Sequence, residues 1–260
     1  NLDFIFLVST LLVLFLISNV LAISPTGGSI TSGTPQTAPA DSAGSALAQA
    51  GNVTSVNING FSTTQTWQGY FGNVTGTIQL ADNADNVIYN WSLAEPEGEI
   101  YSSTNSSISW SNIQCFNFTA NTTGSAGSAG GTNLAGTNLS VLETQFGILS
   151  DDVDGVNETF SFTPAGDGHD LFYTSNLQFS AGECLSTKLF NSGGGQATNQ
   201  FEEALLYEPT SSSVIFASIL EEGALNGFNQ QDNDFEMIVL ENGHGTDTSS
   251  TPYYFYVELQ

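Results

Sequence analysis

The sequence predicts a mainly β protein in which a long hydrophobic N-terminal α-helix is followed by a β-sandwich head. Three observations carry this prediction. Residues 4–23 contain no charged side chain. From residue 53 onward the apolar residues recur with a period of two, as in strands that have one buried face. About ten short apolar runs are separated by Gly, Asn, Asp or Pro, a pattern typical of a sandwich.

The apolar run at residues 4–23 is long enough to cross a bilayer as a helix. At 1.5 Å per residue it would extend about 30 Å. It is apolar on all sides, so it has to be surrounded by lipid or by other helices. Three interpretations stay open: a signal peptide cleaved after Val20-Leu21-Ala22, a plain membrane anchor, or the core helix of a filament.

About the first 24 residues resemble the N-terminal helix of a type IV pilin, where a peptidase cuts just before the apolar segment and leaves no Met. Bacterial pilins usually carry Glu at the fifth mature position, whereas this chain has Ile5 there and Asp3 as its only early acid. Archaeal relatives are less strict at that position. The resemblance implies a filament subunit that polymerises with itself through residues 1–23 and lies in the membrane before assembly. Residues 67–76 and 253–259 are loosely similar to uncharacterised archaeal surface proteins, and this similarity implies no activity.

The composition describes an acidic surface with few charges of any kind. Lys188 is the only Lys or Arg against 26 carboxylates, which gives a net charge of −25, although only 10% of residues are charged. Such a surface repels phosphate, so nucleic acids are excluded as partners. Anionic lipid headgroups are repelled too, so membrane attachment would require the apolar segment. The abundance of Ser, Thr, Asn and Gly favours an extracellular location.

Asn-x-Ser/Thr sequons are concentrated in the first part of the chain. They begin at Asn52, Asn73, Asn90, Asn105, Asn117, Asn121, Asn138 and Asn157. The last hundred residues have none, so we expect N-linked glycans on the N-terminal part of the head. We also expect the sequon-free part to line contacts between subunits.

Two cysteines, Cys115 and Cys184, predict one disulfide in a secreted chain. The bond would close a loop of about 70 residues and would stabilise the fold by roughly 4 kcal/mol. Two separately buried thiols are the alternative. A metal site that also uses His169 and His244 is less favoured, because no pair of these residues has ligand spacing.

The chain divides into three parts. After the apolar segment at 1–23, residues 24–51 form a Gly/Ser/Thr/Pro-rich linker that either tethers the head flexibly or lies in a groove on neighbouring subunits. Residues 52–260 form the β head, with two lobes joined around 119–139 as the alternative to one composite sandwich. The predicted strands lie within 74–80, 87–91, 108–110, 113–118, 171–179, 204–207, 214–220, 235–240 and 253–259. A capping box of Ser140 and Glu143 predicts a short helix that continues to residue 149.

No arrangement of residues predicts catalysis. The chain lacks a nucleophile elbow, a phosphate loop and a His-x-x-x-His pair, and it has two histidines in all. We therefore expect no enzyme activity, no cofactor and no metal. The acidic turns at 151–154 and 232–234 could hold calcium, but acidic turns without metal are commoner.

Together these features predict a structural subunit of an extracellular, cell-surface, type IV pilus-like filament whose glycosylated head serves surface contact or adhesion. The alternative is a membrane-anchored surface glycoprotein or a carbohydrate-binding adhesin that forms no filament. Sugar binding would use exposed aromatic residues, whereas Trp67, Trp91 and Trp110 are expected to fill the core.

Overall fold

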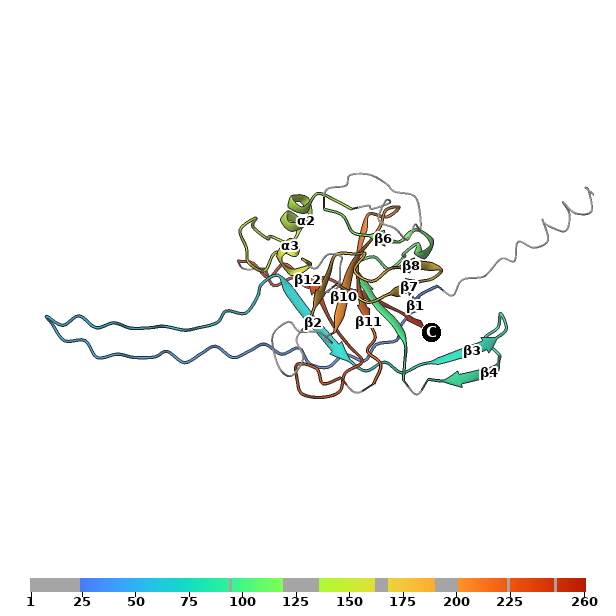
Figure 1. Ribbon diagram of the computed structural model, residues 1–260, viewed down its shortest axis with the longest axis horizontal. Helices are drawn as coiled ribbons and strands as arrows, with labels where there is room; N and C mark the ends of the chain where they lie inside the picture. Colours follow the sequence, from blue (N-terminus) through green and yellow to red (C-terminus); the bar gives the residue numbers. More distant parts are fainter. Residues whose placement is uncertain are drawn as a thin grey trace, which may run out of the picture.

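The computed structural model describes residues 24–93, 95–118, 136–161, 168–189, 201–223, 225–245 and 247–260 (Figure 1). It is mainly β, with 32% strand and 7% helix. The strands are Thr26–Gly27 (β1), Trp67–Gly72 (β2), Thr77–Ala81 (β3), Val87–Ser92 (β4), Gly98–Ser103 (β5), Gln114–Cys115 (β6), Phe172–Thr174 (β7), Leu177–Phe179 (β8), Ser186–Lys188 (β9), Glu202–Glu208 (β10), Ser213–Ile219 (β11), Phe235–Leu240 (β12) and Tyr254–Leu259 (β13). The helices are Trp110–Asn112 (η1, 3-10), Leu139–Gln145 (α2) and Val156–Thr159 (α3).

A seven-stranded antiparallel sheet forms the centre of the body. Its order is β1-β13-β5-β11-β10-β6, and β9 pairs with β10 beside β6. Strands from before and after residues 119–135 lie in this one sheet, so the two halves of the head form a single unit. The other strands form three two-stranded sheets, β12–β2, β3–β4 and β7–β8.

Both faces of the central sheet are buried, because β10 and β11 carry apolar residues at successive positions. Leu205 and Tyr207 face one cluster, whereas Ala204 and Leu206 face a second cluster on the opposite side. The first cluster is covered by β12, β2, α2 and α3. The second is covered by the β7–β8 hairpin, η1 and the segments that carry the two cysteines.

This arrangement corrects the predicted fold class. The β12–β2 pair packs on one face of the central sheet, but the head has several sheets rather than one sandwich, because the other face of the central sheet is also covered. In the part of the chain that the structure describes, the longest helix is α2 with seven residues, so no long apolar N-terminal helix is found. No helix there could span a membrane. Residues 1–23, on which the helix prediction rests, lie outside the described ranges.

Several local predictions are confirmed and others are wrong. Strands occur within 87–92, 202–208, 213–219, 235–240 and 254–259. The predicted strand at 171–179 is instead a hairpin that turns at Ser175, whose φ of 59° lies in the left-handed region. Residues 110–112 form the 3-10 helix η1 rather than a strand. The central strand β5 was not predicted.

The predicted helix is present, but its cap differs. Asn138 is the N-cap residue, and its Oδ1 accepts a hydrogen bond from the Ser140 N–H at 3.0 Å. Glu143 does not complete a capping box. Its Oε1 accepts from the Val156 N–H at 3.2 Å and so joins α2 to α3.

Candidate interaction surfaces

A long arm formed by residues 28–66 projects from one side of the body (Figure 1). Its two ends are held by strand pairing, because β1 pairs with β13 and β2 pairs with β12. Between residues 29 and 64 one backbone hydrogen bond is found, from the Asn52 N–H to the Gln49 carbonyl at 3.2 Å. Among the residues that the structure describes, nearly all peptide groups of the arm therefore have no hydrogen-bond partner.

The arm is exposed along its length, and it has almost no charge. Asp41 is its one charged residue, although the chain as a whole has a net charge of −25. Apolar side chains are exposed on the returning limb, where the exposed fraction is 100% for Val53, 56% for Val56, 90% for Ile58 and 56% for Phe61. A neutral segment with apolar side chains can approach an acidic body without electrostatic repulsion.

The β3–β4 hairpin projects from the body on the side opposite the arm (Figure 1). Its pairing places Ile78 opposite Trp91 and Leu80 opposite Tyr89, so these four side chains share one face. The other face carries Gln79 and the sequon residue Asn90, which pair with each other, and the exposed Ile88 lies next to them in β4 near the register shift. A two-stranded hairpin is at best marginally stable when nothing covers it.

The apolar face of this hairpin is largely open to solvent. Leu80, Tyr89 and Trp91 are exposed by 56%, 59% and 49%, and the rings of Tyr89 and Trp91 lie 4.8 Å apart. Trp91 therefore does not fill the core, contrary to our expectation. Trp110 is buried, and the half-buried Trp67 packs against the first cluster.

The predicted disulfide between Cys115 and Cys184 is present, and both cysteines are buried. His169 supports it rather than binding a metal. Its Nε2 accepts a hydrogen bond from the Cys184 N–H at 2.9 Å, and its Nδ1 lies 2.6 Å from the Asp170 carbonyl oxygen. Burial lowers the pKa of His169, so the imidazole is neutral and bonded on both sides.

The acidic turns that were considered for calcium use their carboxylates within the fold. Asp152 accepts from the Leu149 N–H at 2.7 Å, and Asp234 accepts from the Val74 N–H at 2.6 Å. Asp154 accepts from the Thr64 hydroxyl and thereby holds the returning end of the arm. In the described ranges, no group of three or more His, Cys, Asp or Glu side chains is arranged to hold a metal ion.

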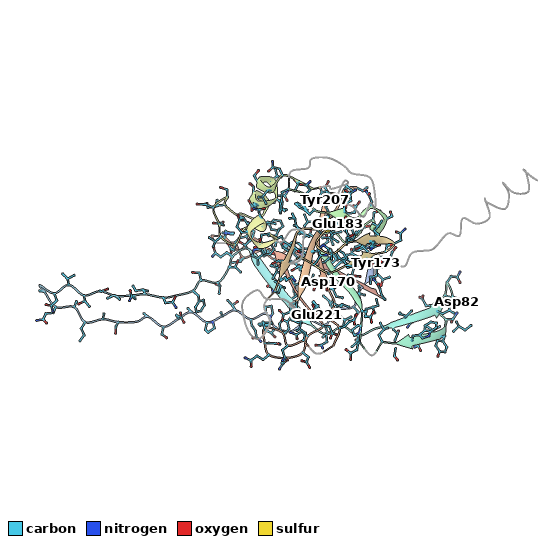
Figure 2. The ribbon with its side chains drawn as sticks, in the orientation of Figure 1. Asp82, Asp170, Tyr173, Glu183, Tyr207 and Glu221 are labelled. Atoms are coloured by element: carbon cyan, nitrogen blue, oxygen red, sulfur yellow. A yellow bond between two sulfur atoms is a disulfide. The ribbon has the colours of Figure 1, made fainter. Side chains whose placement is uncertain are left out.

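The single lysine lies at the end of the β9–β10 pair. Lys188 Nζ lies 2.8 Å from Glu202 Oε1, and both side chains are about nine-tenths buried, with 11% and 10% exposed. Glu202 also accepts from the Asp170 N–H at 2.5 Å. Glu221 lies in the same region of the body (Figure 2), where burial and repulsion by Glu202 and Asp170 raise its pKa to about 7.

Buried carboxyl groups join the β7–β8 hairpin to the central sheet. Glu99 accepts from the Tyr173 N–H at 3.2 Å, and Glu258 accepts from the Ser175 N–H at 2.8 Å. The Tyr101 hydroxyl lies between the two carboxyls, 3.5 Å from Glu99 and 3.4 Å from Glu258. Burial raises the pKa of Glu99 to about 8 and also raises that of Glu258.

Glu203 is fully buried between the central sheet and β12. One of its carboxyl oxygens accepts from the Ile238 N–H at 2.9 Å, and the other has no partner. Burial raises its pKa well above the ordinary value, so the group is held as the neutral acid.

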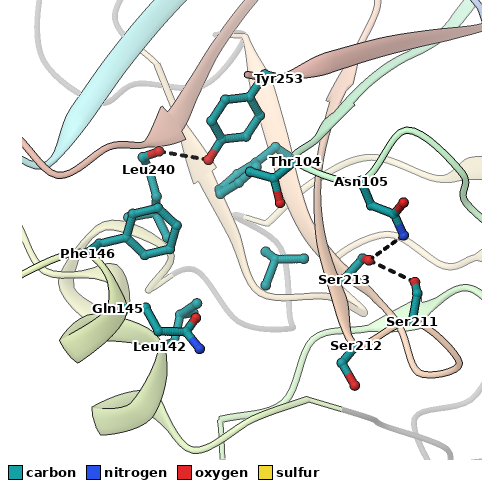
Figure 3. A pocket seen from close by; sticks show the side chains of 12 residues that line it. Thr104, Asn105, Leu142, Gln145, Phe146, Ser211, Ser212, Ser213, Leu240 and Tyr253 are labelled. Atoms are coloured by element: carbon teal, nitrogen blue, oxygen red, sulfur yellow. Dashed lines mark hydrogen bonds between the residues drawn. The ribbon is translucent and has the colours of Figure 1, made fainter. Parts of the chain in front are cut away.

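A cavity of about 380 Å³ opens between α2 and the β10–β11 turn (Figure 3). Its polar lining consists mainly of hydroxyl and amide groups, including those of Thr104, Asn105 and Ser213. The Tyr253 hydroxyl, which also faces the cavity, donates to the Leu240 carbonyl at 2.7 Å. None of the described residues that line this cavity is His, Asp, Glu, Lys or Cys.

The sequons differ in exposure. Asn52, Asn73, Asn90, Asn138 and Asn157 are exposed, whereas Asn105 and Asn117 are half-buried. Asn121 lies outside the described residues. Asn105 lies at the cavity, and its Nδ2 donates to the Ser213 hydroxyl at 2.9 Å. The sequon-free last hundred residues contain the buried strands β10, β11 and β12.

No protein-family model, no curated protein and no solved structure matches this chain.

Proposed function

We propose that this chain is a non-enzymatic structural subunit of an extracellular filament that is built from copies of the same chain. The observation that carries the proposal is the arm of residues 28–66. Its peptide groups are almost all without a partner in the chain, and its apolar side chains are exposed. Ordering a residue in one backbone conformation costs about 1–2 kcal/mol, so an extended arm requires compensating contacts. Another molecule can supply those contacts.

The dimensions of the arm suit a neighbouring copy. Each limb has roughly 18 residues and spans about 60 Å when extended. A body of roughly 190 residues has a radius of gyration of about 16 Å, so the arm is longer than the body is wide. An arm that leaves one side of a copy and binds to a different surface of the next copy makes a head-to-tail contact. Such contacts generate open filaments when the rotation that relates successive copies does not close a ring.

The extracellular part of the proposal is supported by the disulfide and by the exposed sequons. The pilus-like part is supported by the resemblance of the first residues to type IV pilins. Adhesion would be a role of the glycosylated head.

Electron microscopy and light scattering of the purified full chain test this function. We expect elongated assemblies for the unchanged chain. A matched variant keeps the arm length but replaces residues 45–61 with a Gly/Ser sequence, and we expect it to remain monomeric with its disulfide intact. Monomers from the unchanged chain, at every concentration tested, would refute the proposal.

A second candidate function is carbohydrate binding by the hairpin, favoured by the exposed pair Tyr89 and Trp91. Aromatic rings of this kind can stack on sugars, but sugar sites also need polar groups that converge on the ring. The same hairpin face carries Ile78 and Leu80 instead. Retention of the chain on polysaccharide columns, abolished by Trp91→Ala, would support this alternative.

A further inference from the structure

We propose that residues 56–59 of one copy add as a third strand to the β4 edge of the β3–β4 hairpin of a second copy. The inference rests on the proposed self-assembly and identifies the two surfaces that meet. The added strand would place Val56 and Ile58 on the hairpin face that carries Tyr89 and Trp91.

The hairpin has a free edge for this addition. β4 pairs with β3 on one side only, and all six of its residues are exposed. An unpaired edge presents N–H and C=O groups that can pair with another extended chain. The arm offers the matching groups, because its own peptide groups are unpaired. Three strands with an apolar face are considerably more stable than two.

The side-chain patterns of the two segments agree. In the arm, the order Val56-Asn57-Ile58-Asn59 alternates between apolar and polar. In β4, the order Tyr89-Asn90-Trp91-Ser92 does the same. Alternate residues of a strand point to opposite faces, so one register places all apolar side chains on one face and all Asn and Ser on the other. A glycan on Asn90 would extend from the polar face and leave the edge free.

Position and charge favour a second copy as the partner. The arm and the hairpin project from opposite sides of the body, so one chain cannot bring its own arm onto its own hairpin in this arrangement (Figure 1). Asp82 lies at the tip of the hairpin (Figure 2), away from the paired region. An acidic partner would be repelled by a chain of net charge −25, whereas the arm carries only Asp41.

The contact area is consistent with specific association. Tyr and Trp side chains each bury about 150–250 Å² when they are covered. Together with Ile78, Leu80 and two arm side chains, they approach half of the roughly 800 Å² per partner in a standard interface. Repetition of the contact along an assembly would add to its strength.

Copies of the full chain that carry one added cysteine besides the Cys115–Cys184 disulfide test the inference. Copies with Ile58→Cys are mixed with copies carrying Tyr89→Cys or Trp91→Cys, oxidised, and separated on a non-reducing gel. We expect a covalent heterodimer with at least one of the two positions. Asn90→Cys is the matched control, because it lies on the same strand but on the opposite face, and we expect little product with it. Equal yields at all three β4 positions would overturn the proposed register.

A second measurement separates the failure of this inference from the failure of the proposed function. Ile58→Asn should weaken assembly by about tenfold or more, because it removes a buried isoleucine from the contact. Asn59→Gln is the matched neutral change, because it keeps an amide on the opposite face and creates no sequon. Assemblies that form without either crosslink, and that tolerate Ile58→Asn, would overturn the docking site and leave the structural function in place. A hairpin that is protected in monomers by residues 1–23 would overturn it too.

Discussion

Replacing Glu99 with Gln should remove much of the pH dependence of stability. Glu99 is 3% exposed, and burial raises its pKa from 4.5 to about 8. A raised folded-state pKa means that the folded protein holds the proton more tightly than the unfolded chain. The contribution of protonated Glu99 to the free energy of unfolding is therefore complete below pH 4.5 and decreases as the pH rises toward 8.

The magnitude follows from that shift. One pKa unit corresponds to about 1.4 kcal/mol, so the whole shift corresponds to about 5 kcal/mol. At pH 7 the unfolded group is ionised and the folded group is mostly protonated, so about 3 kcal/mol is lost between pH 4.5 and pH 7. For a domain of this size, that loss lowers the Tm by about 6–12 °C.

Thermal unfolding of the full chain across this pH range measures the effect. The unchanged protein should unfold at lower temperature as the pH rises, whereas Glu99→Gln should show a shallower slope and a higher Tm at pH 7. Glu95→Gln, an exposed carboxylate in the preceding loop, is the matched control and should leave the slope unchanged. A Tm that is flat or rises from pH 4.5 to pH 7, or identical slopes for Glu99→Gln and Glu95→Gln, would refute the reasoning.

Three further predictions concern the disulfide, the glycans and the assembly. Cys115→Ser should lower the free energy of unfolding by about 2–5 kcal/mol in denaturant titrations, since Cys115 and Cys184 are 69 residues apart. Glycopeptide mass spectrometry of native material should find the exposed Asn52, Asn73, Asn90, Asn138 and Asn157 modified, and Asn105 unmodified because its amide is hydrogen-bonded beside the cavity. Added salt at neutral pH should increase light scattering by assemblies, because it screens repulsion between chains of net charge −25; assemblies that dissolve as salt is added would contradict this.

The sequence predicted strands best where they lie in the core. The apolar runs of β11 and β12 were found almost to the residue, because burial of a strand requires such a run. β5 was missed, since Glu99, Ser102 and Ser103 make a buried strand look polar. Glu99 and Ser103 bond to partners distant in the chain, Tyr173 and Val214, and local periodicity cannot reveal such partners.

The candidate surfaces could be predicted only in part. The alternation in residues 74–80 indicated a strand with one buried face, but the strand begins at Thr77 and Leu80 on that face is 56% exposed. Period-two spacing shows that one face must be buried without showing which molecule buries it. The composition of residues 24–51 predicted a linker, and the structure places most of these residues in the exposed arm. The composition did not show that the extended part continues to residue 66, because Val53, Val56 and Ile58 resemble the start of a core strand.

The ion pair of Lys188 with Glu202 affects how this protein would be detected. Lys188 is the only site in the chain for a protease that cleaves after Lys or Arg, and its side chain is 11% exposed and engaged. Such a protease should not cut this sequence in the folded protein, and after denaturation it cuts it once, after Lys188, which leaves a long segment on each side. Both are too long for routine peptide identification. Surveys that rely on this digestion should therefore overlook the protein even where it is abundant, whereas cleavage after Glu or aromatic residues should reveal it.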